Sequence, residues 1–153
     1  RAAVADGVPL LGVCVGMQML FETGREMGTH EGLGLLEGDV VRFADGMTED
    51  DEDPRSGTLT QRALKVPHMG WSALTPTTPT PLLDGLDAGT HVYFVHSYHA
   101  APAHPSDVLA TAHYGQHFPA IVGRGRVFGA QFHPEKSQHA GLRLLRNFAT
   151  LPL

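Results

Sequence analysis

The chain is organised around the stretch Val8-Pro9-Leu10-Leu11-Gly12-Val13-Cys14-Val15-Gly16, in which an apolar run ends at a cysteine between two glycines. A continuous apolar run of this length is typical of a strand buried on both faces, and such strands occur mainly in parallel sheets covered by helices. Directly afterwards, Met17, Leu20 and Phe21 recur at i, i+3 and i+4, which predicts a short helix that ends at Gly24. We therefore expect a strand, a tight turn and a helix around the cysteine.

Further strands are expected along the middle and the end of the chain. Aromatic, β-branched and alternating apolar residues predict strands over residues 40–43, 92–98 and 108–114, and a hairpin over residues 121–132. Recurring glycines over residues 28–38, and prolines and threonines over residues 72–81, predict irregular connections.

A C-terminal helix is expected to begin near Ser137, with Leu142, Leu145 and Phe148 on its apolar face. Together with the strands, this helix predicts one α/β domain over residues 1–153, built on a mixed sheet.

Composition excludes several classes of protein. A length of 153 residues suits one domain, and 42% apolar with 18% charged residues is typical of a globular chain. Eleven basic against sixteen acidic residues give a net charge of −5, which excludes a generally basic nucleic-acid binder. No apolar run reaches the ~18 residues of a membrane span. The single cysteine excludes an intrachain disulfide and a zinc site of several thiolates, and it fits a reducing compartment, so we expect a cytoplasmic protein.

The acidity of the chain is a local feature. Six of the sixteen acidic residues lie within residues 45–53, close to Pro54 and Gly57. We expect residues 48–57 to form a solvated surface loop, in preference to an acidic binding site.

Cys14 has the sequence setting of a nucleophile elbow. The turn is so tight that we expect side chains to clash at Gly12 and Gly16, and it lifts the central side chain clear of the sheet. A position at a helix N-terminus favours thiolate over thiol. The backbone N–H of Val15 then points to where an oxyanion would develop. The alternative, a small hydrophobic cysteine at the end of a core strand, stays open at this point.

A second candidate group follows the last predicted strand, in Phe132-His133-Pro134-Glu135-Lys136-Ser137. Pro134 prevents helix formation there, so His133 and Glu135, two residues apart, leave an extended backbone on the same face. A carboxylate on one imidazole nitrogen selects the tautomer, and the other nitrogen can then take a proton from a thiol. A surface turn with an incidental histidine and glutamate is the alternative.

Several spaced motifs together match a known family. Residues 12–18 fit the pattern G-x-C-x-G-x-Q and residues 133–135 supply a later H-P-E, so the chain resembles the class I, or triad, glutamine amidotransferases. Within the family, Val66-Pro67-His68-Met69-Gly70-Trp71, Tyr93-Phe94-Val95-His96-Ser97-Tyr98 and the segment from Phe132 to Ser137 resemble the branch that supplies ammonia for histidine biosynthesis. The resemblance extends from Val8 to Phe148.

The resemblance implies a flavodoxin-like fold with a mixed, largely parallel sheet flanked by helices. It implies a glutaminase in which Cys14 attacks glutamine, His133 transfers protons, Glu135 orients His133 and the Val15 N–H holds the oxyanion. It implies no metal and no organic cofactor.

The resemblance also implies three substrate contacts. Gln18 lies one helical turn after the cysteine and would contact the bound glutamine. Backbone groups of Ser97 and Tyr98 would meet the α-carboxylate and α-amino groups. A metal site at the nearby histidines is not expected, because on one strand His91 and His99 share a face and His96 points away.

A partner is implied as well, a cyclase subunit folded as a (β/α)₈ barrel that receives the ammonia in a heterodimer with hydrolase and lyase activities. Five residues are expected near the docking surface: His68, Met69, Trp71, Tyr93 and Lys136. Exposed aromatic residues, a methionine and a charge beside the catalytic histidine would suit an interface. Core packing for Trp71 and a solvated Lys136 are the alternatives.

The chain departs from the family pattern in three places. Val15 stands where leucine is common, and the acidic segment looks like an insertion. Members of the family carry further strands and a Pro-Gly-Val-Gly loop, the second half of the oxyanion hole, before the nucleophile strand, whereas only seven residues precede Val8 here. We therefore expect an N-terminally truncated form and poor activity of the chain alone. An anthranilate or guanylate synthase type of glutaminase, or a catalytically silent scaffold, are the alternative functions.

Overall fold

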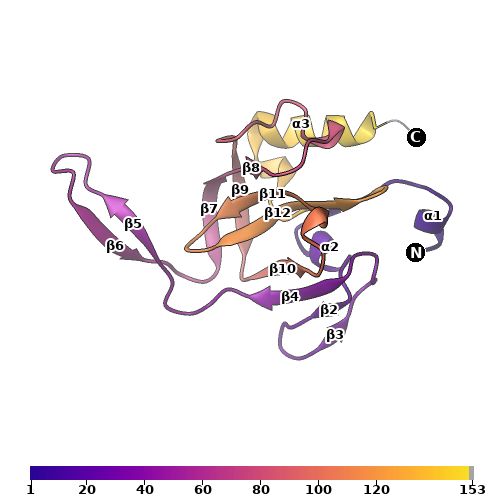
Figure 1. The fold of residues 1–153 in the computed structure, drawn as a ribbon, viewed down its shortest axis with the longest axis horizontal. Helices are drawn as coiled ribbons and strands as arrows, with labels where there is room; N and C mark the ends of the chain where they lie inside the picture. The colour runs from indigo at the N-terminus through magenta and orange to yellow at the C-terminus, as the bar shows by residue number, and fades with distance from the viewer. Residues whose placement is uncertain (152–153) are drawn as a thin grey trace.

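The computed structural model describes residues 1–151, so the last two residues of the predicted domain lie outside it. Its main sheet runs through the centre of the molecule (Figure 1). In spatial order its strands are β1 (Leu10–Val13), β13 (Val127–Ala130), β12 (His117–Arg124), β11 (Val108–His113) and β8 (Thr75–Pro76). Neighbouring strands are antiparallel except for β1 and β13, which are parallel.

A second sheet lies below the first in Figure 1 and packs apolar side chains against it. Its strands are, in order, β10 (Tyr98–Pro102), β4 (Gly38–Arg42), β2 (Thr23–Gly24) and β3 (His30–Glu31). Two further pairs are antiparallel, β7 (His68–Ala73) with β9 (His91–His96), and β5 (Thr48–Glu52) with β6 (Leu59–Ala63).

Three α-helices and three 3₁₀ turns complete the described elements. The α-helices are α1 (Ala2–Ala5), α2 (Val15–Gln18) and α3 (Gln138–Ala149). The 3₁₀ turns are η1 (Pro81–Leu83), η2 (Pro105–Asp107) and η3 (Pro134–Lys136). Among the described residues, no helix has the length and apolar character needed to cross a bilayer.

The predicted α/β fold with a mixed sheet is confirmed, but antiparallel pairing is more common than expected. Only β1 with β13, and β2 with β4, are parallel among the described strand pairs. Short connections join β11 to β12 and β12 to β13, and a short connection permits only antiparallel neighbours. The strand β1 lies at the edge of its sheet and is half-buried, so the expectation that both its faces are buried is wrong for the described chain.

The helix after the cysteine is shorter than predicted. It ends at Gln18, and Gly24 belongs to β2. Met17, Leu20 and Phe21 are nevertheless all fully buried, as their spacing predicts. Beyond the helix, the Leu20 carbonyl accepts hydrogen bonds from the amides of Leu35 and Leu36, in the connection between β3 and β4, and not from a further helical turn.

The C-terminal helix α3 exists as predicted, but a different face is buried. Gly141, Leu144 and Asn147 face the core, whereas Leu142 and Leu145 are exposed. Of the predicted face, only Phe148 packs against the core, where it is half-buried. Two contacts select the buried face. A Cβ at Gly141 would overlap the carbonyl of Pro134, and the Asn147 amide donates to the carbonyls of Leu82 and Asp84 at 2.9 Å each. Neither contact can be predicted from the spacing of apolar residues along the helix.

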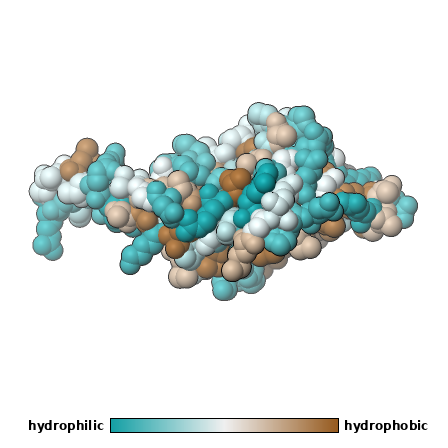
Figure 2. Space-filling view, turned by 90° about the horizontal axis from the view of Figure 1, so that it is seen from below, coloured by the Kyte–Doolittle hydropathy of each residue, from teal (hydrophilic) through white to brown (hydrophobic). Residues whose placement is uncertain are grey.

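The acidic segment is a hairpin and not the predicted loop. Strands β5 and β6 form an arm that projects from the body in Figure 1, and Figure 2 shows mostly hydrophilic and weakly polar residues on it. Cross-strand contacts explain why it pairs, since Arg62 forms an ion pair with Glu49 at 2.9 Å and Gln61 donates to Asp50. The expectation of a solvated surface holds, because nearly all of its residues are exposed.

Two other predicted segments have different bounds in the structure. The connection over residues 72–81 contains the end of β7 and all of β8. The strand predicted over residues 92–98 is broken at Ser97, where β9 ends and β10 begins.

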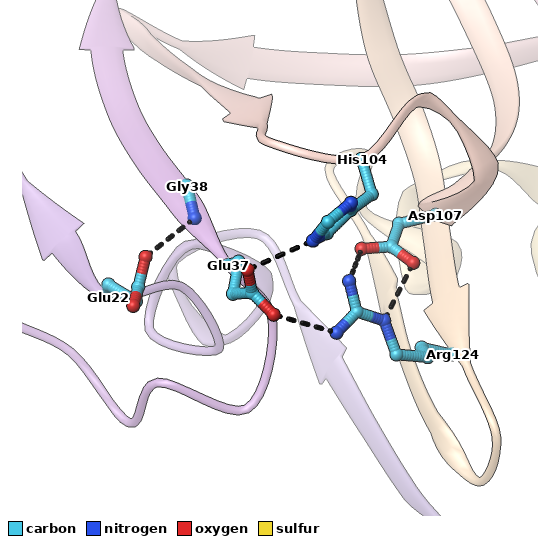
Figure 3. Close-up of polar contacts among 6 residues, drawn as sticks. All are labelled: Glu22, Glu37, Gly38, His104, Asp107 and Arg124. Carbon is cyan, nitrogen blue, oxygen red and sulfur yellow. Dashed lines mark hydrogen bonds and ion pairs between the residues drawn. The ribbon is translucent and has the colours of Figure 1, made fainter.

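An ionic cluster joins the two sheets at the end remote from the cysteine (Figure 3). Arg124, at the end of β12, donates two hydrogen bonds to the buried Asp107 carboxylate at 2.9 and 2.6 Å. It also contacts Glu37 at 3.3 Å, and Glu37 receives a second contact from His104 at 2.9 Å. Glu37 immediately precedes β4, so this cluster fastens the second sheet to the first.

Candidate active site

Cys14 lies at the turn between β1 and α2 in a backbone conformation that few residues adopt. Its φ is 51° and its ψ is −114°, a strained combination for a residue with a side chain. The turn is held by the Cys14 N–H, which donates to the carbonyl of Ala130 on the neighbouring strand at 2.8 Å. Strain of this kind is found where structure over-determines a functional residue.

The two glycines beside Cys14 have different roles. A Cβ at Gly12 would overlap the carbonyl of Gly16, so the turn excludes any side chain there. A Cβ at Gly16 would meet no atom within 4 Å. The expected clash is therefore confirmed at Gly12 and wrong at Gly16.

The thiol of Cys14 does not have the lowered pKa that its position suggested. Burial raises the pKa, the nearby Val15 N–H opposes this, and the negative charge of Glu135 adds to the rise. With only four residues, α2 offers too weak a dipole to compensate for burial. The thiol therefore depends on a base to remove its proton.

His133 and Glu135 form the predicted pair. His133 Nδ1 and Glu135 Oε1 are 2.8 Å apart, so Nδ1 donates and the lone pair of the neutral ring lies on Nε2. Nε2 is buried and has no hydrogen-bond partner among the described residues. Burial raises the pKa of Glu135, but hydrogen bonds from its own backbone amide and from His133, together with the nearby charges, leave the pKa below its usual value. The pair therefore presents a buried basic nitrogen.

The topology of the main sheet brings the cysteine and the histidine segment together. Strands β1 and β13 are parallel neighbours with Val13 opposite Ala130, so their carboxyl ends lie at the same edge. Cys14 follows one strand directly, and residues 131–133 follow the other. The backbone of His133 is fixed further by its N–H, which donates to the Tyr93 carbonyl at 3.0 Å.

Gln131 is a site residue that the sequence reasoning missed. It is fully buried beneath the cysteine, with its amide nitrogen 3.9 Å from Cys14 Sγ and its oxygen accepting from Gln18 Nε2 at 3.1 Å. Gln18 Nε2 also donates to the Tyr98 carbonyl at 2.9 Å. A polar residue at the end of an otherwise apolar strand was the available signal, because a buried amide needs partners.

A pocket of about 240 Å³ opens beside the thiol. It brings together five predicted residues: Cys14, Val15, Gln18, Ser97 and Tyr98. The remaining lining residues, which the sequence reasoning did not assign to a substrate site, are Glu26, Pro67, Val95 and His96. One wall of the pocket is formed by the bend at Ser97, between β9 and β10.

Four of the five residues expected at a partner surface reach the surface together. Met69 is 63% exposed and Trp71 46%, and both lie on β7 beside β9. The Tyr93 ring packs edge-on against Trp71 with centroids 5.8 Å apart, and the Lys136 ammonium lies 5.8 Å from the Tyr93 centroid. Core packing of Trp71 is therefore excluded. This face is called the β7–β9 surface below.

The fifth residue, His68, is a correction. It is only 2% exposed, because the alternation along β7 turns it inward, where its ring stacks on Phe94 and Tyr114. It cannot contact a partner on the β7–β9 surface.

The histidines weighed as metal ligands are spread apart. His91 is exposed, whereas His96 and His99 are buried, so His91 and His99 do not share a strand face as expected. The reason is that the strand is interrupted at Ser97, between β9 and β10. Within residues 1–151, no group of three metal-ligating side chains is found.

Comparison with known proteins places these features in a family. The family model described as glutamine amidotransferase class-I matches residues 1–151. The chain is 56% identical to imidazole glycerol phosphate synthase subunit HisH of Salinibacter ruber, over 98% of this chain, and 51% identical to the protein of the same name from Geobacillus thermodenitrificans, over 97% of this chain. The chain spans 64% of the length of each of these two relatives.

Solved structures show the same fold at lower identity. A glutamine amidotransferase from Thermotoga maritima is 16% identical with a TM-score of 0.59, and the match covers 97% of this chain and 50% of that one. A putative GMP synthase protein from Thermoplasma acidophilum is 18% identical with a TM-score of 0.62, over 96% of this chain and 59% of that one. The expected class I glutamine amidotransferase fold is confirmed by these matches.

Proposed function

The chain belongs to the class-I glutamine amidotransferase family, and on that premise we propose that it is the glutaminase part of imidazole glycerol phosphate synthase. It would hydrolyse glutamine to glutamate and ammonia, and the ammonia would pass to a cyclase subunit that makes imidazole glycerol phosphate and an aminoimidazole carboxamide ribotide for histidine biosynthesis. Identities of 51–56% to subunits of that name support this synthase over the anthranilate and guanylate types.

The observation that carries the proposal is the placement of Cys14 and the His133–Glu135 pair at the ends of two neighbouring parallel strands. Cys14 supplies a sulfur with a pKa raised by burial, and His133 supplies a buried nitrogen without a partner among the described residues. A protonated thiol and an imidazole nitrogen unpartnered within the described chain, at the same edge of the sheet, suit nucleophilic catalysis, in which a base takes the proton of the attacking group.

The reaction proceeds in two halves. His133 Nε2 takes the proton of the Cys14 thiol while the sulfur attacks the side-chain amide carbon of glutamine. The same proton passes to the leaving nitrogen, so ammonia departs and a γ-glutamyl thioester remains. His133 next removes a proton from water, whose oxygen attacks the thioester carbon. Glutamate leaves, and the proton returns to the sulfur.

The remaining residues orient these groups. Glu135 keeps the proton of His133 on Nδ1 and stabilises the imidazolium that forms. The Val15 N–H, near the sulfur at the start of α2, donates to the oxyanion. Gln18 and the backbone groups of Ser97 and Tyr98 line the pocket where the rest of glutamine would lie. The proposed steps need no cofactor or metal.

The β7–β9 surface is the proposed docking site for the cyclase, a (β/α)₈ barrel, in a heterodimer. Val95 of β9 lines the glutamine pocket, so this surface adjoins the site where ammonia is released. Exposed Met69 and Trp71, half-buried Tyr93 and the cation of Lys136 have the composition of an interface core. The lyase activity of the synthase belongs to the cyclase and not to this chain. We place the complex in the cytoplasm.

Glutamate release by the complete protein, with and without the cyclase, tests this proposal. Wild-type protein should release glutamate and support imidazole glycerol phosphate formation from glutamine, whereas Cys14→Ala should support that reaction only from added ammonia. Glutamate release without coupling to this cyclase would indicate another synthase. Equal glutamate release by Cys14→Ala and wild type would contradict the glutaminase itself.

A further inference from the structure

The bend between β9 and β10 is closed by the side chain of His96. His96 Nδ1 lies 2.8 Å from the carbonyl oxygen of Tyr98, two residues along the chain. Ser97, the residue between them, lines the pocket beside Cys14 together with Tyr98. The hydrogen bond therefore spans the backbone segment that forms one wall of the pocket.

The polar partners of His96 leave one arrangement of protons. A carbonyl oxygen only accepts, so His96 donates from Nδ1. His96 is buried against the rings of Phe43, Phe94 and Phe118, and this burial lowers its pKa to about 3, so the ring is neutral and Nε2 accepts. The partner of Nε2 is His68 Nδ1 at 3.2 Å, which must donate.

His68 continues these hydrogen bonds to Ser72, further along β7. Burial also lowers the pKa of His68, to about 4, so its Nε2 accepts in turn. The hydroxyl of Ser72 lies 3.1 Å away and donates to it. Three hydrogen bonds, all donated in the same direction, thus connect Ser72 through His68 and His96 to the carbonyl of Tyr98.

The Tyr98 carbonyl accepts two hydrogen bonds from residues that line the pocket. It accepts from His96 on one side and from Gln18 Nε2 on the other, and Gln18 is itself held by the buried Gln131. Loss of the His96 bond would release both the Ser97 bend and one anchor of Gln18.

We propose that His96 is a positioning residue for glutamine, whose Nδ1–H holds the Ser97–Tyr98 backbone and, through the Tyr98 carbonyl, Gln18 in the geometry that binds the substrate. This inference rests on the proposed function, since it assigns glutamine to the pocket. His96 does not touch the reacting atoms. It should therefore affect substrate affinity more than the chemical step.

Two amide substitutions separate positioning from simple packing. The Asn side-chain nitrogen occupies the place of the histidine Nδ1, whereas the longer Gln places its nitrogen near Nε2. His96→Asn should keep the bond to Tyr98, and His96→Gln should lose it. The control is His99→Gln, since His99 is also buried and donates to a carbonyl, that of Ala100, but does not line the pocket.

The measurement is the Kd of L-glutamine by calorimetry in the complete protein carrying Cys14→Ala, so that no turnover occurs. We expect His96→Gln to weaken binding about tenfold, the worth of one hydrogen bond, with His96→Asn and His99→Gln within about threefold of the parent. In the active protein, His96→Gln should raise KM with little change in kcat. Equal weakening by the Asn and Gln variants, or none by Gln, would overturn the proposal.

A second measurement needs no variant of His96 and does not depend on activity. Imidazole ¹⁵N chemical shifts of the wild-type protein report which nitrogen carries the proton. The proposal requires neutral rings with the proton on Nδ1 for both His96 and His68 at about pH 7. A proton on Nε2 of His96 would overturn it. Failure of the parent protein to bind glutamine, with these tautomers intact, would instead count against the proposed function.

Discussion

The surroundings of Cys14 Sγ and His133 Nε2 suit the reaction that we propose for them. The thiol is held in a strained turn and keeps its proton because it is half-buried. The imidazole has one nitrogen committed to Glu135 and the other buried without a partner among the described residues. A protonated thiol avoids burying a negative charge before the substrate arrives.

At Glu135 we expect a smaller effect than at the two reacting residues. The Glu135 side chain is 59% exposed and acts through the ring of His133, so Glu135→Gln should keep part of the orientation while losing the charge. Glutaminase turnover should fall about 10- to 1,000-fold for Glu135→Gln and almost completely for Cys14→Ala. Steady-state glutamate release in the complete protein measures both. Unchanged turnover in Glu135→Gln would remove this residue from the mechanism.

Substitution of the two glycines in the turn between β1 and α2 tests the geometry of the nucleophile elbow. Gly12→Ala forces an overlap with the Gly16 carbonyl and should lower the free energy of unfolding by about 1–3 kcal/mol. Gly16→Ala meets open space and should change it by less than about 0.5 kcal/mol. Urea unfolding of the two variants compares them directly. Equal destabilisation would show that the two glycines are equivalent, as the sequence alone suggested.

The ionic cluster between the sheets predicts a pH dependence of stability. Hydrogen bonds from His104 and then Arg124 hold the pKa of Glu37 below its usual 4.5. A carboxylate with a lowered folded-state pKa stabilises the protein above its unfolded pKa, and the contribution is lost as the pH falls through the folded value.

Glu37→Gln should therefore be less stable than wild type near neutral pH, and the difference should shrink as the pH falls below about 4.5. Urea unfolding of the two proteins, near neutral pH and again below about pH 4.5, measures this difference. A constant gap between the two proteins would mean that Glu37 is not the titrating group. His139→Gln, a change at an exposed histidine outside the cluster, is a control for general effects of substitution.

Sequence reasoning succeeded where one local pattern determines an element and failed where distant contacts do. The hairpin over β12 and β13 and the burial of Met17, Leu20 and Phe21 follow from local spacing. The buried face of α3 does not, because the Gly141 contact with Pro134 comes from tertiary packing. Likewise, the acidic hairpin pairs through Arg62, which lies outside the acidic run.

The sequence predicts the candidate reacting residues of the site, but not the buried residues that hold them and the pocket in place. The motifs around Cys14 and His133 identify the groups that we propose to react, since each motif is short and continuous in sequence. The supporting roles of Gln131 and His96 were not predicted, because their partners lie far away in the sequence or across the bend between β9 and β10, and no local pattern indicates a buried hydrogen bond.

At the scale of the whole molecule, the β7–β9 surface, our proposed docking site, adjoins the pocket through Val95. Lys136 follows Glu135 and lies over the Tyr93 ring, so on our proposal it would contact the cyclase without touching glutamine. Lys136→Ala should weaken cyclase binding or coupling, by under ~1 kcal/mol if the contact is solvated and ~2–5 kcal/mol if it is desolvated. Calorimetric titration of the two subunits and coupled turnover measure this. Unchanged affinity and coupling would exclude Lys136 from the interface.

The most direct test of the whole account is covalent labelling of the nucleophile. Diazo-oxonorleucine, a glutamine analogue that alkylates nucleophiles, is added to the complete protein with its cyclase, and the adduct is located by peptide mass spectrometry. The account predicts one adduct, on Cys14 Sγ, which glutamine suppresses by competition and which His133→Ala greatly slows. An adduct on another residue while Cys14 stays unmodified would contradict it.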